Sequence, residues 1–289
     1  MILAIVGPTG VGKTALSIAL AKRYQAEIIN FDSMQVYEQL DIGTAKVTKK
    51  EMDGVTHHLL SYVPVDEAYH VYAYQQTARK VLDTLLQQGK NVILVGGTGL
   101  YLKALLYDYR FETLENTNSF DNWTNEALAK EIRKYDKDII FDVNNRRRMI
   151  PLLNKLQQQK EIANQGTKPL YDFQIIGLTL PREHLYQRIN QRVDTMFEHG
   201  LLEEVTNLQD HYSTSKALQN GIGYKEFLPY FKNECSLEEV KEAIKQHSRR
   251  YAKRQYTFFK HQLPVKWYEV CEEDFSIVVE HVIMDIERK

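Results

Sequence analysis

Short runs of apolar residues recur along the chain, and each ends at a turn-forming position. The run at residues 2–6 reads ILAIV and stops at Gly7, and the run at 91–95 reads NVILV and stops at Gly96. Short runs that are apolar at consecutive positions are typical of parallel strands with both faces buried. We therefore predict strands of a parallel sheet at residues 2–6, 27–31, 91–95, 173–180 and 265–270.

Stretches with helical spacing alternate with these runs. One long helix is expected at 236–259, because Ser236 and Glu239 have the spacing of a capping box, and Asp274 is placed to cap a last helix. Repeated alternation of strand and helix indicates an α/β fold. The other helices are predicted at 15–24, 69–88, 100–106 and from Pro181 to Gly200.

The middle of the chain has a different pattern. Residues 125–156 carry helical spacing with many charges, and no apolar strand occurs there. We predict an α/β core made of residues 1–108 and 173–289. A mostly helical insertion at 109–172 interrupts this core.

Composition limits the possible functions and the cellular setting. The 289 residues include 37 Lys and Arg and 38 Asp and Glu, for a net charge of −1, which excludes a uniformly basic coat for nucleic acid. Two cysteines are too few for a disulfide framework or a Cys-rich zinc module. No apolar run approaches the roughly 18 residues of a membrane span, and the first residues lack the features of a signal peptide. We expect a cytoplasmic protein.

A phosphate-binding loop follows the first predicted strand. The sequence GPTGVGKT at 7–14 matches the pattern GxxxxGK[ST] and lies between a strand and a helix, as such loops do. Backbone N–H groups of the loop and the helix start surround a phosphate, Lys13 adds a positive charge, and the Thr14 hydroxyl can bind Mg²⁺. The loop predicts a P-loop NTPase-like fold and is typical of nucleotide-binding, often ATP-binding, proteins. The predicted pyrophosphate-binding residues are Gly7, Pro8, Thr9, Gly10, Val11, Gly12, Lys13 and Thr14.

The ends of the other strands do not match a usual kinase. Kinases and triphosphatases with this loop need an Asp at the end of a later strand to hold Mg²⁺. Here the third strand ends in glycines and Thr98, and the carboxylate Asp32 follows the second strand instead. The residues therefore favour transfer from some other phosphorylated donor, with both strand ends facing one crevice.

Several motifs together resemble those of the tRNA dimethylallyltransferase (tRNA isopentenyltransferase, IPP transferase) family. The resemblance covers most of the chain, and the motifs occur in the family's order. FDSMQVYEQLDIGTAK at 31–46 is far more specific than the phosphate loop alone. The others are GVTHHL at 54–59, VGGTGLYLKALL at 95–106, NNRRR at 144–148, RVDTMFEHGLLEEV at 192–205, GIGYKE at 221–226 and RRYAKRQYTFF at 249–259.

The resemblance implies a prenyl transfer and assigns roles to residues. It implies that a dimethylallyl group passes from dimethylallyl pyrophosphate to N6 of adenosine 37 of tRNA. By this match Asp32 is the general base, Thr98 bonds the leaving group and Arg192 clamps the pyrophosphate. The resemblance also places Ser33, Met34 and Gln35 around the adenine, and it implies Mg²⁺ at Thr14 as the cofactor.

The same resemblance implies contacts with the anticodon stem-loop. Arg147 and Arg148, in the basic run of the insertion, would hold RNA phosphates. Gly223, Tyr224 and Lys225, in GIGYKE, match another RNA-contact segment. The family usually has a longer insertion between Asp108 and Asn144. We therefore expect the contacts of this chain with the anticodon arm to differ from those of the family. We expect the protein to act as a monomer.

Two other enzymes remain as alternatives, and four residues receive simpler interpretations. An adenylate isopentenyltransferase of the cytokinin-forming type would share the core, and a P-loop small-molecule kinase would share the loop. A non-enzymatic RNA-binding protein is disfavoured, because Lys13 and Asp32 are both intact. We interpret His57 and His58 as structural and expect Tyr251 and Phe258 to face the core.

Overall fold

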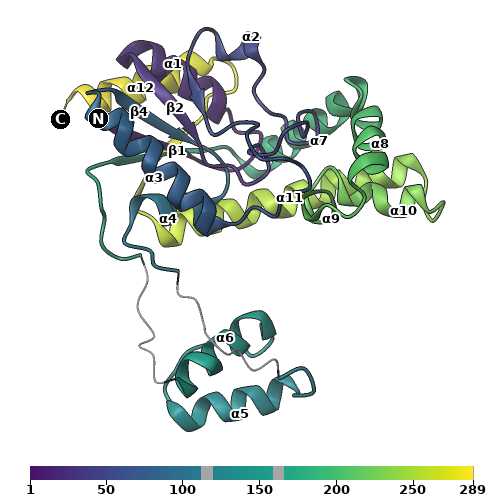
Figure 1. Ribbon diagram of the computed structural model, residues 1–289. Coiled ribbons are helices and arrows are strands. Elements are labelled where there is room, and N and C mark those ends of the chain that lie inside the picture. The colour runs from purple at the N-terminus through teal and green to yellow at the C-terminus, as the bar shows by residue number, and fades with distance from the viewer. Residues whose placement is uncertain (112–119, 159–165, 289) are drawn as a thin grey trace. The chain divides into compact units, whose positions relative to one another are not determined.

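The computed structural model describes residues 1–111, 120–158 and 166–288 and divides the chain into two compact units. The larger comprises Met1–Tyr107 and Pro169–Lys289, and the smaller Asp108–Lys168. A parallel sheet forms the centre of the larger unit (Figure 1). Within the described residues the strand order is β3-β2-β4-β1-β5-β6. The strands are β1 (Ile2–Val6), β2 (Ala26–Asn30), β3 (His57–His58), β4 (Asn91–Val95), β5 (Gln174–Thr179) and β6 (Val265–Glu269).

Alternate side chains of the central strand enter two different hydrophobic clusters. Ile2, Ala4 and Val6 of β1 belong to one cluster, and Leu3 and Ile5 belong to the other. Strand side chains alternate between the two faces, so both faces of the sheet are covered by helices. This explains the unbroken apolar run at 2–6.

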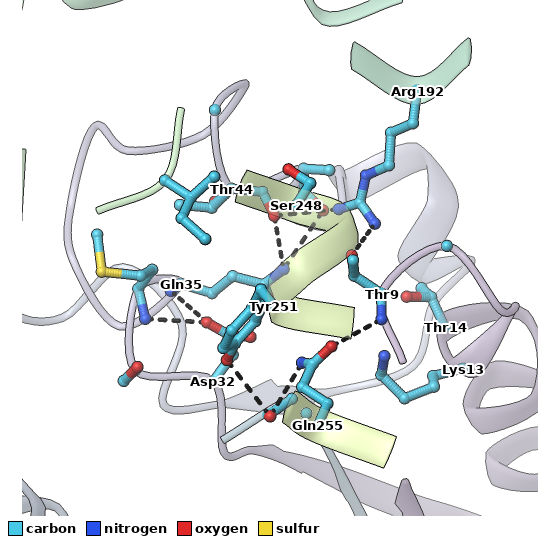
Figure 2. A pocket seen from close by; sticks show the side chains of 18 of the residues that line it. Thr9, Lys13, Thr14, Asp32, Gln35, Thr44, Arg192, Ser248, Tyr251 and Gln255 are labelled. Atoms are coloured by element: carbon cyan, nitrogen blue, oxygen red, sulfur yellow. Dashed lines mark hydrogen bonds between the residues drawn. The ribbon is translucent and has the colours of Figure 1, made fainter. Parts of the chain in front are cut away.

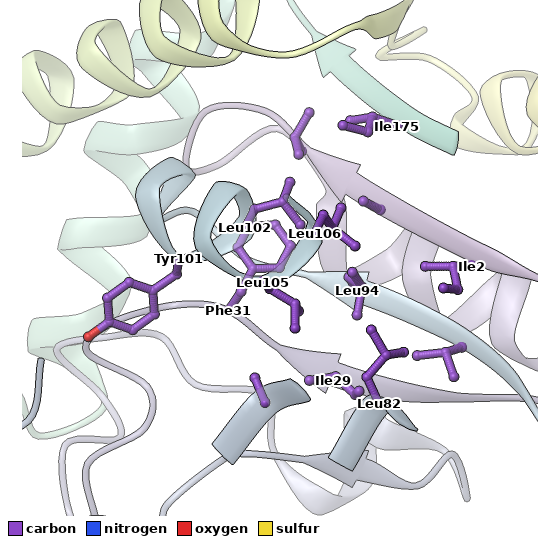
Figure 3. Packing of buried hydrophobic residues seen from close by; sticks show 14 of the residues in the cluster. Ile2, Ile29, Phe31, Leu82, Leu94, Tyr101, Leu102, Leu105, Leu106 and Ile175 are labelled. Carbon is purple, nitrogen blue, oxygen red and sulfur yellow. The ribbon is translucent and has the colours of Figure 1, made fainter. Parts of the chain in front are cut away.

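Helices from distant parts of the chain pack on the two faces of the sheet. Leu82 and Leu102, from α3 and α4, pack on one face (Figure 3). Leu20 and Val282, from α1 and α12, pack on the other. The helices are α1 (Lys13–Tyr24), α3 (Val71–Gln87), α4 (Gly99–Leu106) and α12 (Phe275–Glu287).

A third hydrophobic cluster lies outside the sheet; its helix Arg182–Glu198 was predicted from the sequence, whereas the helices between residues 201 and 231 were not. Its core includes Val36, Val193, Leu201, Leu218 and Phe227. The segments around it are α7 (Arg182–Glu198), α8 (Leu201–Tyr212), α9 (Lys216–Asn220), the 3-10 turn Lys225–Phe227 and α10 (Leu228–Phe231). The short helix α2 (Lys49–Met52) contributes no residue to this cluster.

Most predicted elements of the larger unit are confirmed. The five predicted strands are present, and α11 (Leu237–Gln262) begins at the predicted capping box, in which Ser236 accepts from the N–H of Glu239. Asp274 caps α12 by accepting from the Ser276 N–H. The pair His57–His58 forms the edge strand β3, which the sequence interpretation missed because two residues carry no period.

The smaller unit contains two helices where the sequence suggested continuous helical patterning. They are α5 (Asn125–Tyr135) and α6 (Arg146–Gln157), and Ile132 and Met149 lie in the core between them. Arg146 donates to the backbone oxygens of Phe120 and Trp123, so it holds the segment before α5.

Arg147 and Arg148, next in the basic run, are exposed to solvent. Across both units, no described helix is long and apolar enough to cross a membrane.

Candidate active site

A cavity of about 580 Å³ lies in the larger unit, where β1, β2 and β4 end (Figure 2). The loops after these strands form part of its wall, and α7 and α11 contribute the rest. The carboxyl ends of parallel strands are where open α/β sheets bind ligands. Of the predicted site residues, the cavity is lined by Thr9, Gly10, Gly12, Lys13, Thr14, Asp32, Ser33, Met34, Gln35, Arg192 and Lys225.

The phosphate loop is packed so closely that two of its glycines have no room for a side chain. A Cβ on Gly7 would lie 2.6 Å from the backbone oxygen of Leu178, and a Cβ on Gly12 would lie 2.7 Å from the ring of Phe275. Both glycines also have positive φ, which L-residues rarely adopt. Val11 is buried and faces the core, so only its backbone is available to a ligand. The loop leads directly into α1, whose N-terminal amides favour an anion.

Lys13 is folded back onto its own loop. Its Nζ donates to the backbone oxygens of Gly7 at 3.0 Å and Pro8 at 2.9 Å. Burial and the positive charge of Arg192 lower the pKa of Lys13 to about 7, while the carboxylate of Asp32 acts in the opposite direction. An anion at the loop would therefore favour the protonated form of this side chain.

Arg192, on α7, connects the phosphate loop to a second loop. Its guanidinium donates to Thr9 Oγ1 at 2.9 Å and to the backbone oxygen of Thr44 at 3.2 Å. Burial lowers the pKa of Arg192, and Asp32 again opposes the shift. Among the residues that the structure describes, no carboxylate lies within ion-pair distance of this guanidinium. A buried cation held only by neutral oxygens is suited to binding an anion.

Asp32 uses its two carboxylate oxygens differently. Oδ1 accepts from the N–H groups of Met34 at 2.9 Å and Gln35 at 3.4 Å, so it caps the turn after β2. Oδ2 lies beside Gly97, where a Cβ would be 3.1 Å away. The buried Asn30 accepts from the Asp32 N–H at 3.1 Å and fixes the start of the turn. One oxygen therefore holds the loop, and the other lies beside Gly97 at the cavity wall.

Thr98 ties the loop after β4 to the loop after β2. Its Oγ1 accepts from the Ser33 N–H at 3.0 Å and donates to Ser33 Oγ at 3.1 Å. Thr98 is not among the residues that line the cavity. The expected bond from Thr98 to a leaving group therefore stays a prediction, and the contact observed is with Ser33.

Two predicted RNA-contact residues are placed inside the protein. Tyr224 is 1% exposed, and its hydroxyl donates to Glu204 Oε1 at 2.8 Å. The N–H of Gly223 is bound by the buried Glu226. The Tyr224 ring is packed against Gly43, and the expected contact of this segment with RNA stays a prediction. Lys225 does line the cavity, and Arg147 and Arg148 belong to the smaller unit.

Glu204 holds the loop that Arg192 contacts. Its carboxylate accepts from the backbone N–H groups of Asp41, Ile42 and Gly43 at 3.1, 2.7 and 3.0 Å. Three backbone donors on one carboxylate leave this loop little freedom. The loop in turn supplies Thr44, whose backbone oxygen accepts from Gln35 as well as from Arg192.

One face of α11 carries site residues that the sequence interpretation missed. Ser248, Tyr251 and Gln255 line the cavity at helical spacing, three and four residues apart. Tyr251, expected to face the core, lies at the cavity wall and donates to the Gly97 oxygen at 3.4 Å. Burial raises the pKa of Tyr251, so its hydroxyl keeps its proton. Phe258 continues this face and packs against Gly99. The helical spacing of these residues could be seen in the sequence. The aromatic residues on the same face, however, led to the prediction that this face packs in the core.

The described residues offer one protein ligand for Mg²⁺ at the phosphate loop. Thr14 is exposed at the cavity, next to Lys13. No group of three or more His, Cys, Asp or Glu side chains among the described residues is arranged to hold a metal ion. Mg²⁺ keeps several waters and commonly binds through substrate phosphates, so a hydroxyl beside a phosphate loop suits it.

His57 also lines the cavity, and its ring is oriented by the backbone. Nδ1 lies 2.9 Å from the Val55 oxygen, and burial lowers the pKa of His57. The neighbouring His58 contacts Glu27 through Nε2 at 2.6 Å.

Comparison with known sequences identifies a family. A model described as IPP transferase matches residues 35–262. A tRNA dimethylallyltransferase of Staphylococcus carnosus is 39% identical over 307 residues, which cover 100% of this chain and 97% of the relative. A tRNA dimethylallyltransferase of Streptococcus pyogenes serotype M49 is 43% identical over 291 residues, 98% of this chain and 96% of the relative.

Solved structures agree with the sequence relatives. The full-length tRNA isopentenylpyrophosphate transferase of Bacillus halodurans is 37% identical, with a TM-score of 0.79, and the match covers 99% of this chain and 95% of that one. A eukaryotic dimethylallyltransferase acting on tRNA is 30% identical with a TM-score of 0.78, over 92% of this chain and 73% of that one. The chain therefore belongs to the IPP transferase family.

Proposed function

We propose that this protein transfers the dimethylallyl group of dimethylallyl pyrophosphate to N6 of adenosine 37 in tRNA. One observation carries the proposal: the cavity places a phosphate loop with two cations, Lys13 and Arg192, close to a single carboxylate, Asp32. The cations suit a pyrophosphate, and the carboxylate suits an acceptor that must lose a proton. The names of the relatives supply the tRNA and the prenyl group.

The residues support a transfer in which atoms and charges balance. The lone pair of N6 attacks the first carbon of the dimethylallyl group, the carbon–oxygen bond to pyrophosphate breaks, and the pyrophosphate leaves with the bonding electrons. Lys13, Arg192 and the loop amides stabilise the negative charge that develops on it. Asp32, through Oδ2, accepts the proton that N6 loses.

Mg²⁺ is proposed as the cofactor, with Thr14 as its protein ligand. Bound there, the ion would add positive charge beside the leaving pyrophosphate. The Thr14 hydroxyl lies at the start of α1, next to the loop amides. We also propose that the protein works in the cytoplasm as a monomer.

The alternatives fit the described residues less well. A small-molecule kinase of this fold needs a carboxylate at the end of a later strand, and β4 ends at Gly96 and Gly97. An adenylate isopentenyltransferase does not need to bind an anticodon arm, whereas this chain keeps a separate unit with exposed Arg147 and Arg148.

The proposed reaction also requires the target base to leave the stack of the anticodon loop. The base must do so to reach the cavity, which implies base flipping.

Acceptor competition tests the proposed function. The chain is incubated with Mg²⁺, labelled dimethylallyl pyrophosphate and either unmodified tRNA with adenosines at positions 36–38 or free AMP. We expect label in the tRNA alone. Label in AMP alone would instead support the adenylate enzyme, and ATP consumption without label would support the kinase.

Replacing the proposed base separates catalysis from binding. In Asp32→Asn the amide oxygen can still cap the turn, but the side chain can no longer accept a proton. We expect kcat to fall by about 10²–10⁴-fold with little change in tRNA affinity, as measured by single-turnover transfer and filter binding. The exposed Asp66→Asn serves as the control. Unchanged turnover in Asp32→Asn would remove Asp32 from the mechanism.

The lowered pKa of Lys13 predicts a pH dependence of pyrophosphate binding. Above pH 7 the free side chain is largely neutral, so binding of the anion must include protonation. The affinity for magnesium pyrophosphate should be nearly flat below pH 7 and fall by up to about tenfold per pH unit between pH 8 and 9. Calorimetry should detect this slope in the wild type, and Lys13→Met should bind more weakly and lack the slope. The same slope in both proteins would show that another group titrates.

The exposed arginines of the smaller unit are expected to bind RNA phosphates. The double variant Arg147→Ala/Arg148→Ala should weaken tRNA binding and reduce the slope of log Kd against log salt by about two. Lys22→Ala, which removes an exposed cation of α1, is the control. If the double variant keeps the wild-type salt slope, the basic run is a solvated surface.

A further inference from the structure

Gln255 joins two loops of the cavity through one side chain (Figure 2). Its Oε1 accepts from the Thr9 N–H at 2.9 Å, and its Nε2 donates to the Gly97 oxygen at 3.0 Å. The residue is 5% exposed. The orientation of the amide is fixed, because an N–H group needs the oxygen and a carbonyl needs the nitrogen.

The two ends of this bridge reach the two halves of the proposed chemistry. Thr9 belongs to the phosphate loop and is also held by Arg192 through its hydroxyl. Gly97 lies beside Oδ2 of Asp32, and the next residue, Thr98, binds Ser33. A shift of Gly97 would therefore disturb the position of the base, and a shift of Thr9 would disturb the phosphate loop.

The bridge also explains why residue 97 is a glycine. A Cβ at this position would lie 2.3 Å from Nε2 of Gln255. The φ angle of Gly97 lies outside the left-handed region, so the backbone conformation does not itself require glycine. Glycine is required because the amide of Gln255 approaches residue 97 so closely.

We propose that Gln255 is a positioning residue that couples the pyrophosphate loop to the loop beside the general base. Binding of the donor at the phosphate loop then orders the acceptor side of the cavity through Thr9, Gln255 and Gly97. The Thr9 N–H is engaged in this bridge, so the phosphate is bound by the amides that follow it. The identity of the two substrates rests on the proposed function, but the bridge itself does not.

The variant Gln255→Glu tests the bridge through a pH profile. A neutral carboxylic acid can still accept from Thr9 and donate to Gly97, whereas a carboxylate would face the Gly97 oxygen with negative charge. Burial raises the pKa of an introduced carboxyl. We expect kcat of Gln255→Glu to be about 10²-fold below the wild type at pH 8 and to recover toward it as the pH falls to 6. Gln255→Met, which makes neither bond, should stay low at both values.

The matched control is Gln262→Glu, the same change on the same helix at an exposed position. Its kcat should follow the wild-type profile. If Gln255→Glu follows the wild-type profile, or is reduced by the same factor at every pH, the proposal is wrong. Absence of prenylated tRNA with the wild-type chain would count against the proposed function and not against the bridge.

Hydrogen exchange tests the coupling without turnover. Magnesium pyrophosphate should slow exchange of the phosphate-loop amides in both the wild type and Gln255→Met. It should also slow exchange at residues 33–35 in the wild type but not in Gln255→Met. Equal protection of residues 33–35 in the two proteins would overturn the coupling.

Discussion

An excess of positive charge in a partly desolvated cavity is the constraint on which this site depends. The described residues lining the cavity include the cations Lys13, Arg192, Lys225 and Arg254 but only one carboxylate, Asp32. Holding like charges away from water is unfavourable unless they are bonded or neutralised. The protein meets this constraint by directing Lys13 and Arg192 onto backbone oxygens and by lowering their pKa values. The positive charge of the cavity is therefore balanced only when an anion is bound there.

The supports of this arrangement come from segments that are far apart in the sequence. Arg192 on α7 contacts Thr44, and the loop of Thr44 is fixed by Glu204 on α8. Gln255 on α11 bridges the loops that follow β1 and β4. The helices outside the sheet thus hold the loops at its edge, and the phosphate loop alone would not define the site.

The sequence predicted the parts of this structure that depend on local rules. The apolar runs, the phosphate loop and the cap at Ser236 each carry their signal within a few neighbouring residues. Asp32 was read as either a turn cap or a base; the structure shows the cap through Oδ1 and leaves the role as a base a prediction. The prediction for Tyr251 was wrong because helical spacing does not show whether a helix face packs in the core or lines a cavity. The burial of Tyr224 could not be predicted, because it depends on Glu204 and Gly43, which only the folded chain brings together.

The contact between Gly12 and Phe275 has a consequence for biosynthesis. The phosphate loop is synthesised long before α12, whose Phe275 ring packs against Gly12. The carbonyl that faces Gly7 comes from Leu178, also made much later. While the chain emerges from the ribosome, the loop therefore lacks the surfaces that shape it. The nascent chain can therefore give this loop its final packing only after α12 has been made.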